Sequence, residues 1–295
     1  MSFDLKEWSA ERLARVEQAL SAWIPADTPA SLGVAMRYAV LDGGKRLRPL
    51  LVLGASEAVG GNADAALRAG CAVELIHAYS LVHDDMPCMD NDVLRRGKPT
   101  VHVAYGEATA LLAGDALQAL AFELLAPEGA GISDRTQATL CRLLATAAGH
   151  AGMAGGQAID LAAVGKSLSE SELRQMHRLK TGALLQASVM MGAACGEATP
   201  QATNGLASYG RAMGLAFQVV DDILDVTADS ATLGKTAGKD AAQEKPTYVS
   251  LLGLGRARAY AADLLQQAIA ALATTGLPDT RALLALAEMV VHRDN

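Results

Sequence analysis

The stretch Gly214-Leu-Ala-Phe-Gln-Val-Val-Asp-Asp-Ile-Leu-Asp225 joins an apolar helical pattern to a group of acids. On a helix, Asp221 and Asp225 are four residues apart and Asp222 and Asp225 are three apart, so these carboxylates share one face and repel one another. They also lie near the carboxyl end of the helix, where the dipole disfavours anions. A solvated acidic face is one interpretation. The other is a bound cation, and hard oxygen ligands with open positions suit Mg²⁺.

The composition predicts that this helix is one of many. Of the 295 residues, 51% are hydrophobic and only 4% are aromatic, and Ala and Leu dominate the apolar set. That mixture favours helices over strands. Short Gly, Pro and Asp breaks separate the periodic segments, with no low-complexity linker and no fixed repeat. We expect an all-α protein with one domain over residues 1–295, a large helical bundle with a central cavity between its aspartate-rich helices.

A second acidic cluster weakens the solvated-face interpretation. The segment His77-Ala-Tyr-Ser-Leu-Val-His-Asp-Asp-Met-Pro-Cys-Met-Asp90 also ends an apolar helical pattern in aspartates. Pro87 cannot continue a regular helix, so Asp90 must return through a bulge or turn. Two such helix ends could face each other across a cavity and hold more than one metal ion.

The charge pattern points to a site that binds phosphate groups. The formal net charge is −7, and the seven aspartates of the two clusters sum to that value, so the acidity is local. Basic residues follow both clusters, and another basic group precedes Pro49. Because Pro49 fits the first turn of a helix, Lys45 and Arg48 would lie at a helix N-terminus, which favours anions. A basic cap on a surface helix is the alternative. The basic groups lack interleaved aromatics, so we expect no nucleic-acid partner; they are Lys45-Arg46-Arg48, Arg95-Arg96-Lys98 and Lys235-Lys239-Lys245.

Other features predict a soluble cytoplasmic protein with no membrane partner. The four cysteines are far apart without metal-ligand spacing, and three lie in apolar surroundings typical of reduced, buried thiols. Residues 1–24 read as a charged amphipathic helix rather than a signal peptide. No apolar run reaches the roughly 18 residues that span a bilayer.

Five segments together resemble the short-chain trans-isoprenyl diphosphate synthases, in particular the bacterial farnesyl diphosphate synthase type. They are GGKRLRP at 43–49, HAYSLVHDDMPCMDNDVLRRGKPTVH at 77–102, LKTGALL at 179–185, GLAFQVVDDILDVTAD at 214–229 and LGKTAGKD at 233–240. The similarity covers nearly the whole chain.

The resemblance implies a role for each matching residue. Asp84, Asp90 and Asp221 would hold three Mg²⁺ ions around an allylic diphosphate, with Asp85 also in the catalytic set. Lys180, Arg95, Lys235 and Lys245 would bind that diphosphate. Lys45, Arg48, His77 and Arg96 would bind isopentenyl diphosphate, and Thr181 and Gln218 would lie near the reacting carbons. Gln157, Asp160 and Asp115 would lie beside the cavity, one step from the substrate.

The resemblance also implies a reaction and a product. The allylic diphosphate, dimethylallyl or geranyl, would ionise, the double bond of isopentenyl diphosphate would attack the cation, and loss of a proton would follow. Tyr79 and small Ser80 would limit the chain length, and with the Pro87-Cys88 insertion they look like the farnesyl (C15) type. The geranylgeranyl (C20) type shares that insertion and stays open. A homodimer is expected from the family.

Two further classes are less favoured. A class I terpene cyclase would not need a second diphosphate site at Lys45 and Arg48, and the 4% aromatic content argues against its aromatic cavity. A non-catalytic prenyl-diphosphate-binding subunit would have lost an aspartate motif, and both motifs are complete here.

Overall fold

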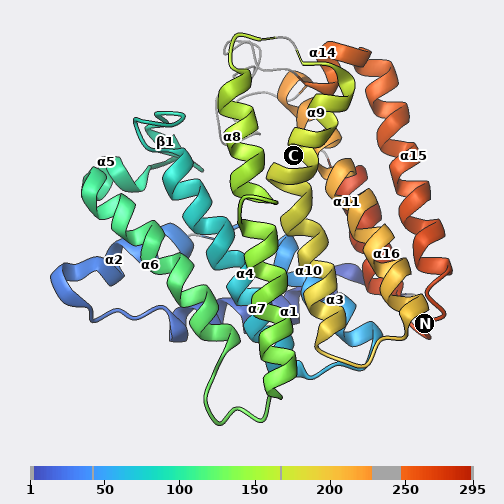
Figure 1. The fold of residues 1–295 in the computed structure, drawn as a ribbon, viewed down its shortest axis with the longest axis horizontal. Coiled ribbons are helices and arrows are strands. Elements are labelled where there is room, and N and C mark those ends of the chain that lie inside the picture. Colours follow the sequence, from blue (N-terminus) through green and yellow to red (C-terminus); the bar gives the residue numbers. More distant parts are fainter. Residues whose placement is uncertain (1–2, 42, 167, 228–246, 294–295) are drawn as a thin grey trace.

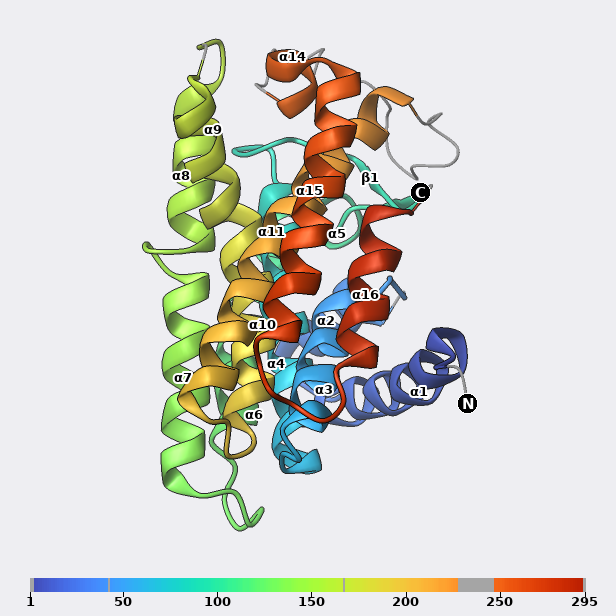
Figure 2. The ribbon, with the colours of Figure 1, turned by 90° about the vertical axis from the view of Figure 1, so that its right-hand side faces the viewer.

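The chain forms a bundle of helices, which confirms the all-α prediction (Figures 1 and 2). A computed structural model describes residues 3–41, 43–166, 168–227 and 247–293. Its helices are α1 Leu5–Trp23, η1 Pro29–Ser31, α2 Leu32–Val40, α3 Leu47–Ala58, α4 Ala63–Asp84, α5 Val101–Tyr105, α6 Glu107–Leu125, α7 Asp134–Ala148, α8 Met153–Ala163, α9 Glu170–His177, η2 Arg178–Gly182, α10 Ala183–Ala194, α11 Pro200–Thr227, α14 Tyr248–Leu252, α15 Leu254–Ala273 and α16 Arg281–Val291. Strands β1 Leu94–Arg95 and β2 Lys98–Pro99 pair antiparallel.

Polar side chains begin several helices where the sequence supplies them. The carboxylate of Asp4 accepts hydrogen bonds from the first turn of α1, and the amide oxygen of Asn62 accepts one from Ala65 at the start of α4. Ser169 and Glu172 form a reciprocal capping box at α9. These caps satisfy backbone N–H groups that have no partner inside the helix.

The long helices lie side by side in a continuous row. Helix α4 packs between α6 and α3, α10 packs between α3 and α11, and α11 packs against α15. In Figure 1 this row runs from α6 at the left to α15 at the right, with α7 and α8 on the near side. The aspartates therefore end two core helices of the row, α4 and α11.

Helix α4 contributes many side chains to the core. Leu75 and Ile76 are completely buried, and alanines such as Ala69 and Ala72 allow neighbouring helices to approach closely. Burying one large aliphatic side chain contributes about 1.5–3 kcal/mol. The helix that ends in Asp84 is thus fixed by its core contacts.

Two described helices are long and apolar enough to span a membrane, contrary to the expectation that no such run exists. They are α4, in which 67% of the 18-residue apolar segment is buried inside the protein, and α6, in which 39% of that segment is buried. The burial of α4 identifies it as a core helix. Helix α6 leaves apolar side chains exposed, among them Leu111 and Leu112.

Candidate active site

A cavity of about 400 Å³ lies between α4 and α8 and is closed at one side by η2. Asp84, Tyr79 and Ser80 line it from α4, and Lys180 and Thr181 line it from η2. The other described lining residues are Arg48, His77, Leu81, His83, Met89, Met153, Ala154, Gln157, Ala158 and Leu161. Charged groups and an apolar wall therefore share one space, as a ligand with a polar head and an apolar tail requires.

The first aspartate cluster returns on itself at the end of α4. The helix ends at Asp84, and the backbone N–H of Asp90 donates a hydrogen bond of 2.8 Å to the carbonyl of Asp84. Asn91 takes a left-handed conformation with φ of 51°. The predicted turn after Pro87 is confirmed. Burial raises the pKa of Asp84 to about 6, against the pull of Lys180, and the Asp90 charge raises it further.

Asp85 faces a different environment from Asp84. It is 2% exposed, and its carboxylate accepts hydrogen bonds from Nε of Arg95 at 2.8 and 3.0 Å. Burial raises the pKa of Asp85, and the Arg95 guanidinium opposes this shift. Both residues line a smaller cavity of about 70 Å³, together with His77 and Arg96. Arg95 already has a carboxylate partner, and Asp85 does not line the larger cavity.

The three aspartates lie on helix α11, as predicted, but their side chains meet different surroundings. Asp221 keeps 40% of its side chain exposed and pairs with Arg293. Asp222 is buried and accepts hydrogen bonds from Nε2 of Gln218 at 2.9 Å and from the backbone of Tyr248 at 2.7 Å. Asp225 is also buried. Because each residue turns about 100° around a helix, neighbours in the sequence meet different elements.

The donor set fits a magnesium ion that takes part of its coordination from substrate. Within the described residues, no three acids, histidines or cysteines converge as a ready metal cage. Asp84 and Asp90 interact electrostatically across their turn, where burial disfavours the charge on Asp84 unless a cation lies nearby. Mg²⁺ binds through one or two carboxylates plus phosphate oxygens and water. Asp84 and Asp90 meet that requirement from one side.

Lys180 and Thr181 lie on a π-helix, η2, which the sequence pattern did not indicate. A side chain at position 156 would place its Cβ 2.1 Å from the backbone nitrogen of Lys180, and one at position 214 would place its Cβ 2.7 Å from Cα of Gly182. The two glycines let α8 and α11 approach η2. Single-turn π segments often occur at functional sites. Nζ of Lys180 donates to Asp160 at 2.6 Å, so Asp160 holds the side chain of Lys180.

Thr181 begins a chain of hydrogen bonds that crosses to α11. Its hydroxyl donates to Oε1 of Gln218 at 3.0 Å, and the amide of Gln218 donates to Asp222. The sequence predicted Thr181 and Gln218 as neighbours of the reacting carbons, and the structure places them in contact. It adds Asp222 as the group that fixes the orientation of the Gln218 amide.

The basic loop before α3 lies at a helix N-terminus, as predicted. Helix α3 begins at Leu47 and has Pro49 in its first turn. Burial lowers the pKa of Arg48, and its Nε atom is buried without a hydrogen-bond partner. Burial also lowers the pKa of Lys45, whose side chain does not line the larger cavity. An anion would supply the missing partner for Arg48.

His77 lies in the wall that the two cavities share. Burial lowers its pKa well below the ordinary value, and the charges of Arg48 and Arg96 lower it further. His77 is therefore neutral at pH 7 and can donate one hydrogen bond to an anion. The structure brings His77, Arg48 and Arg96 together, and these are three of the four residues predicted for isopentenyl diphosphate.

The apolar part of the larger cavity includes both residues predicted to limit chain length. The hydroxyl of Ser80 donates to the carbonyl of His77 at 2.8 Å, and the ring of Tyr79 packs edge-on against His83 at 5.7 Å. Gln157 also lines this cavity, and both polar atoms of its amide are buried without a partner. The sequence ranked Gln157 one step from the substrate. Asp115 is exposed on α6 and does not line the cavity.

Part of the predicted phosphate-binding set cannot be placed. Lys235 and Lys245, like Lys239, lie outside the described residues. The cationic groups that line the two cavities are Lys180, Arg48, Arg46, Arg95, Arg96 and Lys98.

Comparison with known proteins identifies relatives along the whole chain. The family model for polyprenyl synthetases matches residues 29–283. A probable farnesyl diphosphate synthase of Sinorhizobium fredii is 52% identical over 91% of this chain and 82% of its own length. A chloroplastic geranylgeranyl pyrophosphate synthase of Capsicum annuum is 46% identical over 99% of this chain and 80% of its own.

Solved structures with the same fold are also similar in sequence. An FPP/GFPP synthase from Zymomonas mobilis has a TM-score of 0.86 and 43% identity, covering 97% of this chain and 98% of its own. A geranyltransferase from Helicobacter pylori, solved with magnesium and isoprenyl diphosphate, has a TM-score of 0.84 and 35% identity, covering 98% of this chain and 97% of its own.

Proposed function

We propose a reaction and product for this chain from the premise that it belongs to the polyprenyl synthetase family and is a prenyl-transferring enzyme. The chain condenses isopentenyl diphosphate with dimethylallyl or geranyl diphosphate and releases (2E,6E)-farnesyl diphosphate and diphosphate. The observation that carries the proposal is the cavity of about 400 Å³ with Asp84 and Lys180 beside Ser80 and the apolar wall. All 295 residues form one polyprenyl synthetase domain in this proposal.

The chain's own groups bind and orient the two diphosphates. Lys180, held by Asp160, presents a positive charge to the leaving diphosphate at one end of the cavity. Arg48 and neutral His77, which line the same cavity, bind the second diphosphate. Binding both substrates in one space makes the carbon–carbon bond formation effectively intramolecular.

Asp84, Asp90 and Asp221 would hold magnesium, with three ions expected once substrate is bound. Magnesium supplies charge neutralisation of the departing diphosphate. The relative from Helicobacter pylori, solved with magnesium and isoprenyl diphosphate, supports this assignment.

Thr181 and Gln218 stabilise the allylic cation that ionisation leaves. The Thr181 hydroxyl donates to the Gln218 carbonyl oxygen, so the lone pairs of both oxygens lie close together beside the cavity. Fixed dipoles that point at a developing charge lower the barrier without reorganisation. Attack by the isopentenyl double bond forms the new carbon–carbon bond, and the released diphosphate accepts the proton.

The C15 product is favoured over C20 by two residues that line the cavity. Tyr79 and Ser80 lie on α4 below Asp84, where the growing tail would run. Both product classes occur among the relatives, with 52% identity to a C15 synthase and 46% to a C20 synthase. The C20 synthase remains the second candidate. The basic residues Lys45 and Arg48, which suit a second diphosphate, and the 4% aromatic content disfavour a terpene cyclase, and the complete aspartate motifs disfavour a non-catalytic subunit.

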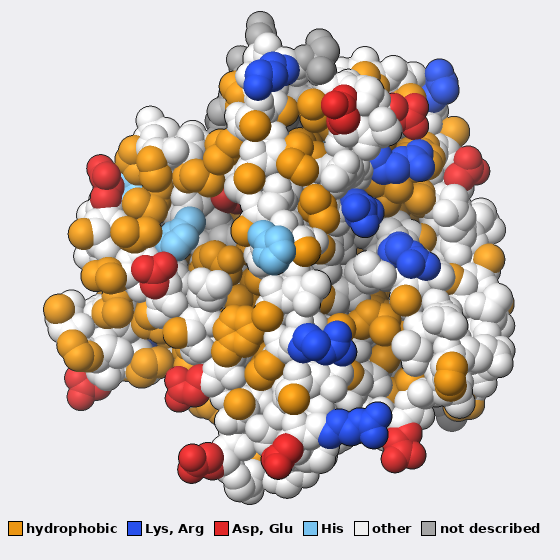
Figure 3. Space-filling view, viewed as in Figure 1, with side chains coloured by type: hydrophobic (Ala, Val, Ile, Leu, Met, Phe, Trp, Pro, Cys, Tyr) orange, Lys and Arg blue, Asp and Glu red, His pale blue; other side chains and the backbone are white. Residues whose placement is uncertain are grey.

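A homodimer with no membrane partner and no nucleic-acid partner, working in the cytoplasm, completes the proposal. Helix α6 is apolar yet only 39% buried, and hydrophobic side chains gather over α5 and α6 at the left of Figure 3. A second copy would cover Leu111 and Leu112, which are 46% and 55% exposed. Sedimentation of the purified protein tests this, and a monomer at micromolar concentration would reject it.

Product analysis tests the reaction. The protein is incubated with isopentenyl and geranyl diphosphates and Mg²⁺, with and without chelator, and the dephosphorylated products are separated by chromatography. A C15 alcohol that disappears with chelator is expected. A C20 alcohol would replace the product assignment, and hydrocarbons formed without isopentenyl diphosphate would indicate a cyclase. No product at all would reject the reaction.

A further inference from the structure

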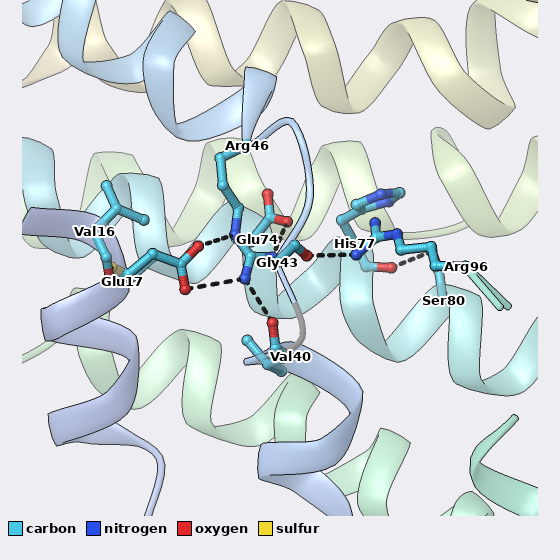
Figure 4. A network of polar contacts seen from close by, with 10 residues as sticks. Val16, Glu17, Val40, Gly43, Arg46, Glu74, His77, Ser80 and Arg96 are labelled. Carbon is cyan, nitrogen blue, oxygen red and sulfur yellow. Dashed lines mark hydrogen bonds and ion pairs between the residues drawn. The ribbon is translucent and has the colours of Figure 1, made fainter. Parts of the chain in front are cut away.

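Arg46 lies inside the basic loop before α3 and lines the smaller cavity, but its guanidinium is held by protein groups. The residue is 4% exposed, and its guanidinium has three protein partners. Nη1 donates to Glu74 at 2.8 Å, Nε donates to Glu17 at 2.6 Å, and Nη2 donates to the carbonyl of Val40 at 2.6 Å. Figure 4 shows Arg46 between Glu17 and Glu74.

These contacts join three separate helices to one loop. Glu17 belongs to α1, Val40 is the last residue of α2, and Glu74 lies in the middle of α4. His77 is one turn beyond Glu74 on α4, so the ion pair fixes the loop relative to the helix that carries His77. On the other side, Arg96 donates to the carbonyl of Gly43 in the same loop.

The backbone of Arg46 is strained. It is the N-cap of α3 and has φ of 45° and ψ of 35°, the left-handed region that a residue with a Cβ rarely adopts. The strain turns the chain so that Lys45 and Arg48 flank the buried side chain. Strained conformations persist only where the surroundings over-determine them. The hydrogen bonds to Glu17, Glu74 and Val40 provide that constraint.

A buried ion pair is weak support for stability, because desolvation offsets much of the attraction between the charges. Glu74 is 3% exposed, so both charges of the pair are removed from water. The arrangement is better explained by what it positions. Arg48, two residues later, has a buried Nε without a partner, and Lys45 precedes it at the start of α3.

We propose that Arg46 is a positioning residue for the isopentenyl diphosphate site: its ion pair with Glu74 orders the 43–48 loop so that Lys45 and Arg48 meet the second diphosphate beside His77. The proposal rests on the proposed function. Arg46 itself touches no substrate in it. Its pair with Glu74 connects the loop to α4, the helix that carries His77.

The direction in which two substitutions change the KM for isopentenyl diphosphate distinguishes a positioning role of Arg46 from a purely electrostatic one. Arg46→Gln removes a positive charge from the basic region, and Glu74→Gln removes a negative one. If Arg46 acted only through its charge, Arg46→Gln would raise the KM for isopentenyl diphosphate and Glu74→Gln would lower it. If the pair positions the loop, both variants raise that KM. Arg46→Lys gives a third comparison, because Lys keeps the charge but cannot form the same fork of hydrogen bonds.

The measurement is steady-state kinetics with each substrate varied at saturating concentration of the other. Each single variant should raise the KM for isopentenyl diphosphate about tenfold, with kcat and the KM for geranyl diphosphate changed less than about threefold. The double variant Arg46→Gln/Glu74→Gln should be no worse than either single variant, because the two groups act as one unit. Val52→Ala, in the buried core of α3, is the control for general destabilisation.

Direct binding keeps this test independent of the reaction. Calorimetric titration of inorganic diphosphate without Mg²⁺ should show weaker binding to Arg46→Gln and Glu74→Gln than to the wild type or Val52→Ala. Absence of product from the wild type would reject the proposed function, while the titration would still test Arg46. A lower KM in Glu74→Gln, a normal KM in Arg46→Lys, or an equal rise in the KM for geranyl diphosphate would overturn the proposal.

Discussion

The backbone N–H of Tyr248 donates a hydrogen bond of 2.7 Å to Oδ2 of Asp222, which lies 26 residues earlier in the chain. The other carboxylate oxygen accepts from Gln218. Asp222 therefore connects the start of α14 to Gln218, the side chain that orients Thr181. Its place in an aspartate motif does not make it a metal ligand, since both oxygens already serve the protein.

Asp222→Asn should therefore damage both stability and turnover. Asparagine offers one acceptor oxygen where two donors converge, so its amide would face a donor. A buried donor without a partner costs about 1–3 kcal/mol, and we expect the free energy of unfolding to fall by that amount. The kcat should fall as Gln218 loses its orientation. Denaturant unfolding and initial rates measure these effects. The control is Asp263→Asn, at an exposed position of α15. Unchanged stability would contradict the assignment.

The sequence predicted the helices and the chemistry of the site better than it predicted which group each site residue contacts. Spacing identifies two aspartate motifs, but cannot tell that Asp221 meets Arg293 while Asp222 meets Tyr248, because those contacts depend on distant elements. The sequence of the basic loop likewise does not show that Arg46 is paired with Glu74, whereas the Nε atom of Arg48 has no hydrogen-bond partner.

The π-helix η2 was missed for a similar reason. Residues 178–182 have no local pattern that distinguishes one turn of π-helix from α-helix. The signal lies elsewhere in the chain, in Gly156 and Gly214, which permit the close approach of their helices to η2. A glycine inside a helical pattern often has such a packing reason, and only the fold shows which partner it meets.

Ser80→Phe should shorten the product. Ser80 lines the cavity on α4, and a phenyl ring would fill part of its 400 Å³. The tail would then stop one isoprene unit earlier, and the product should shift from C15 towards C10. Chromatography of dephosphorylated products measures the ratio, with Ser80→Ala as the control that keeps the space. An unchanged C15 share in Ser80→Phe would contradict the role of this position.

Arg293→Gln should lower the Mg²⁺ concentration that gives half-maximal activity. The Arg293 guanidinium pairs with Asp221, donates to the carbonyl of Phe217 at 3.0 Å and lies 4.1 Å from the Phe217 ring centroid. Asp221 is substantially exposed, so the pair is worth about 0.5–1 kcal/mol, or roughly two- to fivefold in metal affinity. Titration of the initial rate with Mg²⁺ checks this.

The matched control for Arg293 is Arg281→Gln, which breaks an exposed pair with Asp279. Its metal requirement should equal that of the wild type. The same requirement in both variants would mean that Arg293 does not compete with a cation at Asp221.

His177 should give the protein a pH-dependent stability. Burial lowers the pKa of His177 to about 4 from its ordinary 6.5; the charge of Asp160 opposes this shift and that of Lys180 adds to it. The ring also stacks on Tyr248 and lies 4.0 Å from the carboxylate of Asp222. Between these pH values the unfolded chain binds a proton that the folded chain does not, so the free energy of unfolding rises with pH. Stability is present above about pH 6.5 and is lost as the pH falls towards 4.

Replacing His177 by Phe keeps the stacked ring and removes the proton. The free energy of unfolding should then depend less on pH between 4.5 and 6.5. The pH-dependent change that is lost amounts to up to about 3 kcal/mol over the full pKa shift of His177. Urea unfolding at several pH values measures it. His150→Gln, at an exposed position, should keep the wild-type slope. If His177→Phe also kept that slope, a different group would be responsible for the loss in acid.

Gln157→Leu should separate stability from activity. Both polar atoms of the Gln157 amide are buried without a partner, and the residue lines the cavity beside Asp84 and Lys180. Replacing an unsatisfied polar group by an apolar one of similar size is neutral or stabilising, because no hydrogen bond is lost and a desolvation cost is removed. The midpoint of thermal unfolding should therefore stay the same or rise. If the amide is kept for a bound diphosphate or its water, kcat/KM should fall at least tenfold, which corresponds to about 1.4 kcal/mol of lost transition-state stabilisation.

Gln186→Leu is the control, because that amide already donates to the carbonyl of Ala207 at 3.2 Å, so its loss should cost stability and leave kcat/KM unchanged. A Gln157→Leu protein that is less stable and fully active would mean that the amide serves the fold and not the ligand.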